Sequence, residues 1–88
     1  MAKFVEVSPL SDPETAARKL IEIANCVEAL QEGRIHIEKV NGPFLFQIKG
    51  TPDQYLAGLK HAIERGWIVM HESGTFIRFT EAGADLFA

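Results

Sequence analysis

The sequence is poor in the features that assign a chemistry directly. Its one cysteine, Cys26, cannot form a disulfide within the chain, and no glycine-rich phosphate-binding loop occurs. The longest uninterrupted apolar runs, such as residues 67–70, are far shorter than the ~20 residues that cross a bilayer. We therefore expect a cytoplasmic protein that has no membrane association, no cofactor and no enzymatic step.

Positive charge is also scarce. The chain carries 9 Lys and Arg against 12 Asp and Glu, which gives a formal net charge of −3. Because Lys and Arg supply most of the affinity for a phosphate backbone, this balance disfavours a nucleic-acid partner. The whole acidic excess falls within residues 1–32, whereas cations and acids balance from residue 33 onward. A local basic face in the second part of the chain is therefore compatible with the sequence.

The length and composition predict one small globular domain. The chain has 88 residues, of which 47% are apolar and 24% charged. We assign residues 1–88 to a single domain and leave residues 1–10 open as a flexible or strand-like arm. Since a domain of this size has a narrow stability margin, oligomerisation would be a natural supplement.

The first helix is marked at both ends. Ser11 with Glu14 three residues later fits a capping box, and Pro13 suits the first turn. The pattern predicts a helix that continues to about Glu32 and ends at Gly33, the residue best suited to a left-handed C′ position. Its apolar stripe comprises Leu20, Ile23, Ala24, Val27 and Leu30.

This stripe is broad enough to contact more than one neighbour. Ile21 and Cys26 widen it on opposite flanks, and Cys26 fits a small core residue better than a nucleophile. Glu28 and Glu32 are expected on the opposite, solvated face. We hypothesise a homodimer that forms through the stripe, with Ile21, Cys26 and Leu30 at its interface.

The middle of the chain is less clear. Arg34 to Val40 alternates apolar and polar side chains and predicts a short, half-buried strand. Residues 43–49 fit either a strand or a two-turn helix, and we prefer a helix that begins at Pro43 and stops at Gly50.

The last part of the chain gives the clearest signals. Thr51 and Pro52 fit the cap and first position of a helix that runs through Arg65 and ends at Gly66. The expected buried face of this helix comprises Tyr55, Leu56, Leu59, Ala62 and Ile63. Residues 67–71 and 76–79 then predict a β-hairpin, and Thr80 can cap a short final helix that carries Leu86 and Phe87.

This order of elements resembles a winged helix-turn-helix domain. The resemblance is carried by residues 59–68 (LKHAIERGWI) and 73–83 (SGTFIRFTEAG), within a region of about 50–87. It implies an α+β fold with a small three-stranded antiparallel sheet, a recognition helix and a hairpin wing. It also implies a DNA-binding module in transcriptional regulation, here expected as a homodimer on double-stranded DNA.

The contact residues that we expect for DNA lie mainly on the helix over residues 52–65. Small residues at 57 and 58 would allow close approach to a groove, and the contact set is Gln54, Lys60, His61, Arg65, Lys49 and Arg78. Lys49, Lys60 and Arg78 are assigned as phosphate contacts by their positions in the resembling fold. A solvated helix face with no partner is the alternative interpretation of this surface.

Two departures from the family favour a second function. The expected wing tip, residues 72–75, has no Lys or Arg, and Asp53 opens the recognition-helix candidate. The alternative is a protein-interaction or dimerisation module that keeps the fold and does not bind DNA.

The remaining candidate residues suggest no site. His36, His61 and His71 lie with Cys26 on four separate elements without metal-binding spacing, so no metal site is expected. Aromatic residues at strand and helix junctions are interpreted as core: Phe44, Phe46, Trp67, Phe76 and Phe79.

Overall fold

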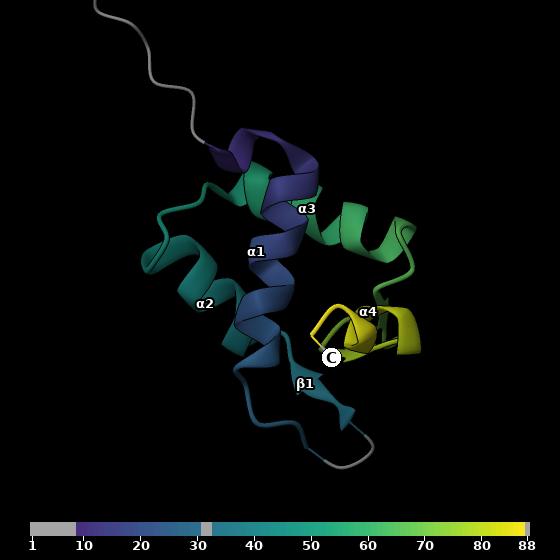
Figure 1. Ribbon diagram of the computed structural model, residues 1–88. Helices are drawn as coiled ribbons and strands as arrows, with labels where there is room; N and C mark the ends of the chain where they lie inside the picture. The colour runs from purple at the N-terminus through teal and green to yellow at the C-terminus, as the bar shows by residue number, and fades with distance from the viewer. Residues whose placement is uncertain (1–8, 31–32, 88) are drawn as a thin grey trace, which may run out of the picture.

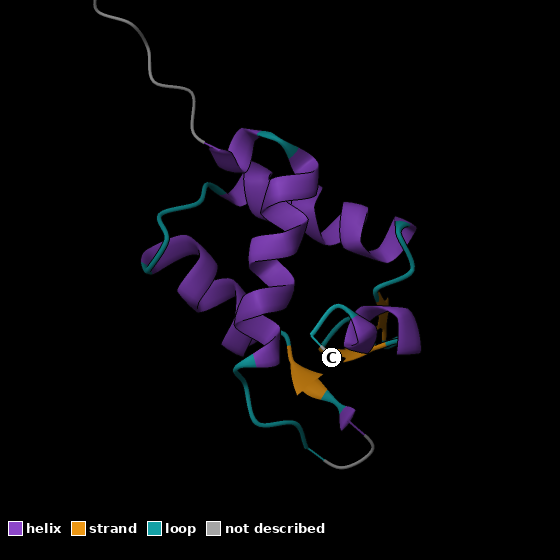
Figure 2. Cartoon of the chain, in the orientation of Figure 1, coloured by secondary structure: helices purple, strands orange, loops and turns teal. Residues whose placement is uncertain are grey.

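The fold is α+β, as the sequence predicts, with a three-stranded antiparallel sheet in the order β1-β3-β2 (Figures 1 and 2). The computed structural model describes residues 9–30 and 33–87; the predicted arm falls largely outside them, as does Glu32. The elements in chain order are η1 (Pro9–Ser11), α1 (Pro13–Asn25), β1 (Ile35–His36), α2 (Glu38–Phe46), α3 (Pro52–Glu64), β2 (Ile68–Met70), β3 (Phe76–Phe79) and α4 (Glu81–Asp85).

The N-cap of α1 lies one residue later than predicted. Asp12, not Ser11, is the N-cap residue, and its side chain makes no capping bond to the backbone. Instead Asp12 Oδ2 accepts a hydrogen bond of 2.9 Å from the Thr15 hydroxyl. Pro13 occupies the first turn, as predicted.

The predicted end of α1 at about Glu32 is wrong, because the helix stops at Asn25. Beyond it the Leu30 N–H bonds to the Arg34 carbonyl at 2.7 Å, so Leu30 does not continue the helix. Gly33 does have a left-handed φ of 74°, but it lies shortly before β1 and not at a helix end. Glu28 is therefore not on a helix face, and loop closure overrides the helical spacing of Val27 and Leu30.

The predicted strand over residues 34–40 divides into two elements. Only Ile35 and His36 pair with β3, and α2 begins at Glu38. The N–H groups of Val40 and Asn41 both bond to the Ile37 carbonyl, which closes the first helical turn. Apolar residues at alternate positions predict a strand. A pattern this short, however, also fits the first turn of a helix, so it does not separate the two.

The helical interpretation of residues 43–49 is confirmed, although Pro43 lies inside α2 and not at its start. Gly50 was expected to take the left-handed position, but Lys49 does so, with a φ of 62°. Gly50 has another role, because a Cβ there would lie 2.2 Å from Cε1 of Phe44. The glycine leaves room for the fully buried Phe44 ring.

Helix α3 begins as predicted and ends at Glu64, one residue before the predicted last residue, Arg65. The Thr51 hydroxyl accepts from the Gln54 N–H, while Gln54 Oε1 accepts from the Thr51 N–H, and this reciprocal pair forms a capping box. Gly66 follows the helix with a φ of 77°. The buried side of α3 comprises Tyr55, Gly58, Leu59 and Ala62.

Two predicted core positions and one predicted surface position on α3 are wrong. Leu56 is 59% exposed and Ile63 is 38% exposed, whereas Gly58 is buried against α1. A Cβ on Gly58 would lie 2.9 Å from the Ala16 Cβ and 3.1 Å from the Ala17 backbone nitrogen. The small residues let α1 and α3 cross in close contact, and this crossing sets which side of α3 is buried.

The hairpin and a short final helix capped by Thr80 are confirmed, but α4 ends at Asp85, before Leu86 and Phe87. Strands β2 and β3 pair with Val69 opposite Arg78, and the turn between them contains Gly74 at a φ of 77°. The Thr80 hydroxyl accepts a hydrogen bond from the Gly83 N–H at 3.0 Å and caps α4. The same hydroxyl donates to the Gly66 carbonyl, so it also ties α4 to the end of α3.

The core lies where α1 crosses α2, α3 and the inner face of the sheet (Figure 1). Phe44 and Trp67 are buried as predicted, and Phe79 packs partly buried against the core. Phe46 is 77% exposed, so its assignment to the core is wrong. Cys26 is also exposed, because α1 ends before it.

Candidate interaction surfaces

Three residues of the expected DNA-contact set lie on one stripe along α3, and they contact the N-terminal part of the domain at Ser11 and Glu14. His61 Nε2 lies 2.7 Å from Glu14 Oε1, and the Gln54 side-chain amide donates to the Ser11 hydroxyl at 3.4 Å. Arg65 Nε lies 4.0 Å from the same Glu14 oxygen. This stripe of α3 therefore makes polar contacts within the domain.

Glu14 is the centre of a charged cluster at this crossing. Arg18 Nη2 lies 2.9 Å from Glu14 Oε2, and the guanidinium groups of Arg18 and Arg65 lie 5.1 and 5.0 Å from the Trp67 ring centroid. The hydrogen bond from His61 lowers the pKa of Glu14 below its ordinary value, helped by Arg18 and Arg65 and opposed by partial burial. The sequence offers only the Glu14 and Arg18 spacing as a signal for this cluster.

Lys60 lies on a different side of α3 from that stripe. Helical spacing places it with three other exposed residues at the centre of the outward side, opposite the buried one; the four are Asp53, Ala57, Lys60 and Glu64. Two carboxylates therefore accompany one ammonium group on this side. Leu56 and Ile63 form its edge, on the flank away from His61.

Arg78 and Lys49 complete the expected contact set at other places. Arg78 projects from β3 on the outward face of the sheet, and Lys49 follows α2 in a left-handed conformation. Gln54, His61 and Arg65 thus share one stripe that contacts Ser11 and Glu14, and neither Lys60 nor Arg78 lies on it.

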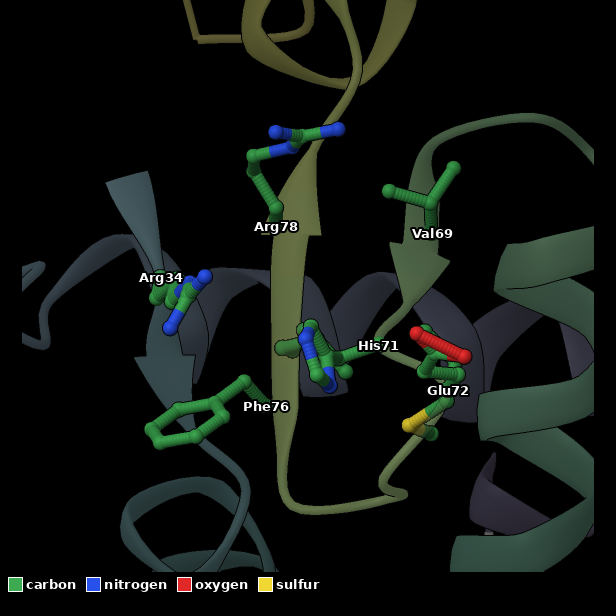
Figure 3. Close-up of a pocket in the computed structure, with 8 residues that line it drawn as sticks. Arg34, Val69, His71, Glu72, Phe76 and Arg78 are labelled. Carbon is green, nitrogen blue, oxygen red and sulfur yellow. The ribbon is translucent and has the colours of Figure 1, made fainter. Parts of the chain in front are cut away.

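The outward face of the sheet contains a cation that the sequence argument missed. Arg34 lies just before β1 on the same face as Arg78, with Val69, His71 and Phe76 nearby (Figure 3). Its guanidinium carbon lies 5.6 Å from the Phe76 ring centroid. Alternation along the short strand could have indicated this placement, because Arg34 and His36 share one face of β1.

The three residues of the hypothesised dimer interface do not lie on one exposed surface. Ile21 is only 2% exposed and packs in the domain core, so its assignment to an interface is wrong. Cys26 and Leu30 are exposed beyond the end of α1, and their role in an interface stays a prediction.

Over residues 9–30 and 33–87, no three His, Cys, Asp or Glu side chains are grouped to hold a metal ion. His36 Nδ1 lies 3.7 Å from Glu38 Oε1, His61 contacts Glu14, and the His71 Nδ1 accepts from the Ser73 N–H.

No helix within residues 9–30 and 33–87 has the length and apolarity to cross a membrane. Within the same ranges the buried Tyr55 hydroxyl has no hydrogen-bond partner, and burial raises the pKa of this tyrosine.

Comparison of the chain with protein-family models, with curated proteins and with solved structures found no match. The function must therefore be inferred from the surfaces of the domain. The relevant surfaces are the outward side of α3, with its apolar edge, and the outward face of the sheet.

Proposed function

We propose that the chain is a non-enzymatic interaction module that binds a partner protein through the outward side of α3. The observation that carries the proposal is the exposure of Leu56 (59%) and Ile63 (38%) along one flank of this helix. Spaced seven residues apart, they occupy the same stripe two turns along the helix. Large apolar side chains that pack at the centre of an interface supply much of its binding energy.

The charges beside this flank define the chemistry of the partner. Asp53 and Glu64 lie on the outward side with Lys60, so the surface has one more acid than base. A protein that places apolar side chains on Leu56 and Ile63, with Lys or Arg opposite the two acids, would be complementary to it. A phosphate backbone would be repelled by the same carboxylates.

A selection from a displayed random-peptide library tests this proposal, because such a library samples many partner chemistries at once. We expect the selected peptides to combine apolar residues with Lys or Arg. Leu56→Asp should weaken their binding by about tenfold or more, which is the loss expected for a central interface residue. Leu86→Asp is the matched control, because Leu86 is 42% exposed and lies at the end of α4, away from α3.

Peptides that bind the Leu56→Asp variant as tightly as the wild type would place the binding surface elsewhere. Failure to select any peptide dependent on Leu56 or Ile63 would contradict the proposal in the same way. Sedimentation of the wild type at micromolar concentration should accompany the selection, because a dimer that Leu56→Asp dissociates would identify the partner as a second copy.

Double-stranded DNA is the second candidate partner, and the order of elements favours it. One helix, a strand, two helices and a hairpin are compatible with a winged helix, in which α3 would be the recognition helix and β2-β3 the wing. This candidate expects binding that falls steeply with salt, and Lys60→Ala should weaken it by about 1 kcal/mol or more. The protein-binding proposal expects neither effect.

A further inference from the structure

The turn of the β2-β3 hairpin is closed by His71. The His71 N–H donates to the Phe76 carbonyl at 2.8 Å, and the His71 carbonyl accepts from the Gly74 N–H at 2.8 Å. These two bonds hold the His71 backbone where the paired strands end. Its side chain is therefore placed within reach of the turn that follows.

The His71 ring is a hydrogen-bond acceptor for the backbone of this turn. The Ser73 N–H donates to His71 Nδ1 at 3.0 Å. Because a backbone N–H can only donate, this ring nitrogen carries no proton, and the proton of the neutral imidazole is on Nε2. The bond joins a side chain to the backbone two residues later, as an Asn side chain does in an Asx turn.

The Ser73 hydroxyl completes a short chain of hydrogen bonds. Its Oγ lies 2.8 Å from the same Nδ1 and accepts from the Thr75 N–H at 3.2 Å. Phe76 packs on the imidazole, with ring centroids 6.0 Å apart and an interplanar angle of 86°. The neutral ring of His71 therefore holds Ser73 directly and Thr75 through the hydroxyl.

Protonation of the ring removes this acceptor. In the imidazolium both ring nitrogens are donors, so Nδ1 would face the Ser73 N–H with a proton of its own. The Nδ1 proton can still be donated to the Ser73 hydroxyl, but the Ser73 N–H would lose its partner to water. Histidine is the side chain that changes charge between about pH 5 and 8, so the loss would occur near physiological pH.

Charged and titratable groups of three other segments lie near this ring in the described part of the chain. Glu72 follows it in the turn, and Arg34 and Arg78 line the same hollow on the outward face of the sheet (Figure 3). His36 of β1 contacts the Phe76 ring, with centroids 5.0 Å apart. Arginine and glutamate keep their charges over most of pH 5–8, whereas histidine does not. Variants must therefore separate the two histidines.

We propose that His71 makes the tip of the hairpin, residues 72–75, sensitive to pH: the neutral ring holds the turn through the Ser73 N–H, and the imidazolium does not. The bond between His71 and Phe76 joins their backbones, so it does not depend on the charge of the ring. The change is therefore confined to the tip, and it does not depend on the function proposed for α3.

An NMR titration of the ¹⁵N-labelled full chain between pH 5 and 8 tests the proposal. We expect the ring nitrogens of neutral His71 to show the proton on Nε2. The amide signals of Ser73 and Thr75 should shift with the same midpoint as the His71 ring. Solvent exchange of the Ser73 amide, corrected for the pH dependence of exchange itself, should be about fivefold faster with the charged ring, the factor that one ordinary hydrogen bond supplies.

Two variants separate the acceptor from its titration. His71→Asn keeps a side-chain oxygen that accepts from the Ser73 N–H at every pH, so the Ser73 signal should not respond to pH. His71→Leu removes the acceptor, so the Ser73 amide should exchange fast throughout. His36→Gln is the matched control, because it removes the other histidine and should leave the response of the tip unchanged.

A neutral His71 ring that carries its proton on Nδ1 would overturn the proposal. A Ser73 amide signal that does not follow the titration of His71, or a response that persists in His71→Asn, would also overturn it. Loss of the response in His36→Gln would assign the effect to His36 instead. The ring measurement uses the wild type, so it decides the proposal even if a substitution unfolds the hairpin.

Discussion

The two sides of helix α3 differ in what their residues contact. The inner side crosses α1 through Gly58 and carries His61 along its edge, where the imidazole meets Glu14. The outward side presents Leu56 and Lys60 to solvent. A helical wheel assigns polar residues to the surface, but on α3 a polar stripe packs on another helix while two large apolar residues stay exposed. The polar stripe that a helical wheel would assign to a binding partner is therefore partly used for contacts within the domain.

The largest expected effect comes from filling the inner side. Gly58→Val should destabilise the protein by about 2 kcal/mol, because the added atoms meet Ala16 and Ala17 of α1 and overpack the crossing. Ala57→Val is the control, since it places the same β-branched residue at an exposed position of α3; helix propensity favours Gly58→Val over it, so a larger loss in Gly58→Val must come from packing. Urea unfolding of both variants measures the difference. Equal stabilities would contradict the close crossing of α1 and α3.

The hydroxyl of Tyr55 on the inner side gives an effect of the opposite sign. Tyr55→Phe should stabilise the protein by about 1 kcal/mol, because it removes a buried donor that is unpaired within the described residues. Chemical denaturation measures this change. A loss of stability in the Phe variant would instead reveal a hydrogen-bond partner for the hydroxyl.

The contact between Glu14 and His61 predicts a smaller, pH-dependent effect. The pKa of Glu14 is lower in the folded protein than its ordinary value of 4.5. The carboxylate therefore contributes stability above that value, and the contribution is lost as the pH falls through the folded-state pKa. Thermal unfolding of the wild type and Glu14→Gln should give midpoints that differ at neutral pH and converge in acid. A difference that persists at low pH would assign the effect to packing.

The smallest expected effect on stability comes from the outward side. Leu56→Ser should change the free energy of unfolding by no more than about 0.5 kcal/mol, because an exposed side chain loses few contacts. Chemical denaturation would detect a larger loss, which would show that Leu56 packs within the domain. A stable Leu56→Ser variant would leave binding as the reason for a leucine at this position.

Local signals in the sequence predicted the elements whose ends are set by their own residues. Thr51 with Gln54 and Thr80 with Gly83 form caps between neighbours in sequence, so α3 and α4 start where expected. The start of α2 and the end of α1 depend instead on the pairing of Ile35 with Ile77. This pairing joins segments far apart in the chain, and hydrophobic spacing does not encode it.

The candidate surfaces show the same difference between what local spacing predicts and what depends on long-range packing. Spacing alone placed Gln54, His61 and Arg65 on one stripe of α3, and in the structure all three contact Ser11 or Glu14. It could not show that the stripe faces Glu14, because that contact depends on how two helices cross. The small residues Ala16, Ala17 and Gly58 were the available signal, since they mark a close approach of backbones.

The central claim is that α3 presents its outward side to a protein and not to DNA. Fluorescence anisotropy of a labelled random DNA duplex at ~50 mM salt tests it most directly, with protein up to about 100 µM, the weak end of non-specific DNA binding. We predict no saturable binding that involves α3. Binding that falls by orders of magnitude at ~200 mM salt, and that Lys60→Ala weakens while Leu56→Ser does not, would contradict the account.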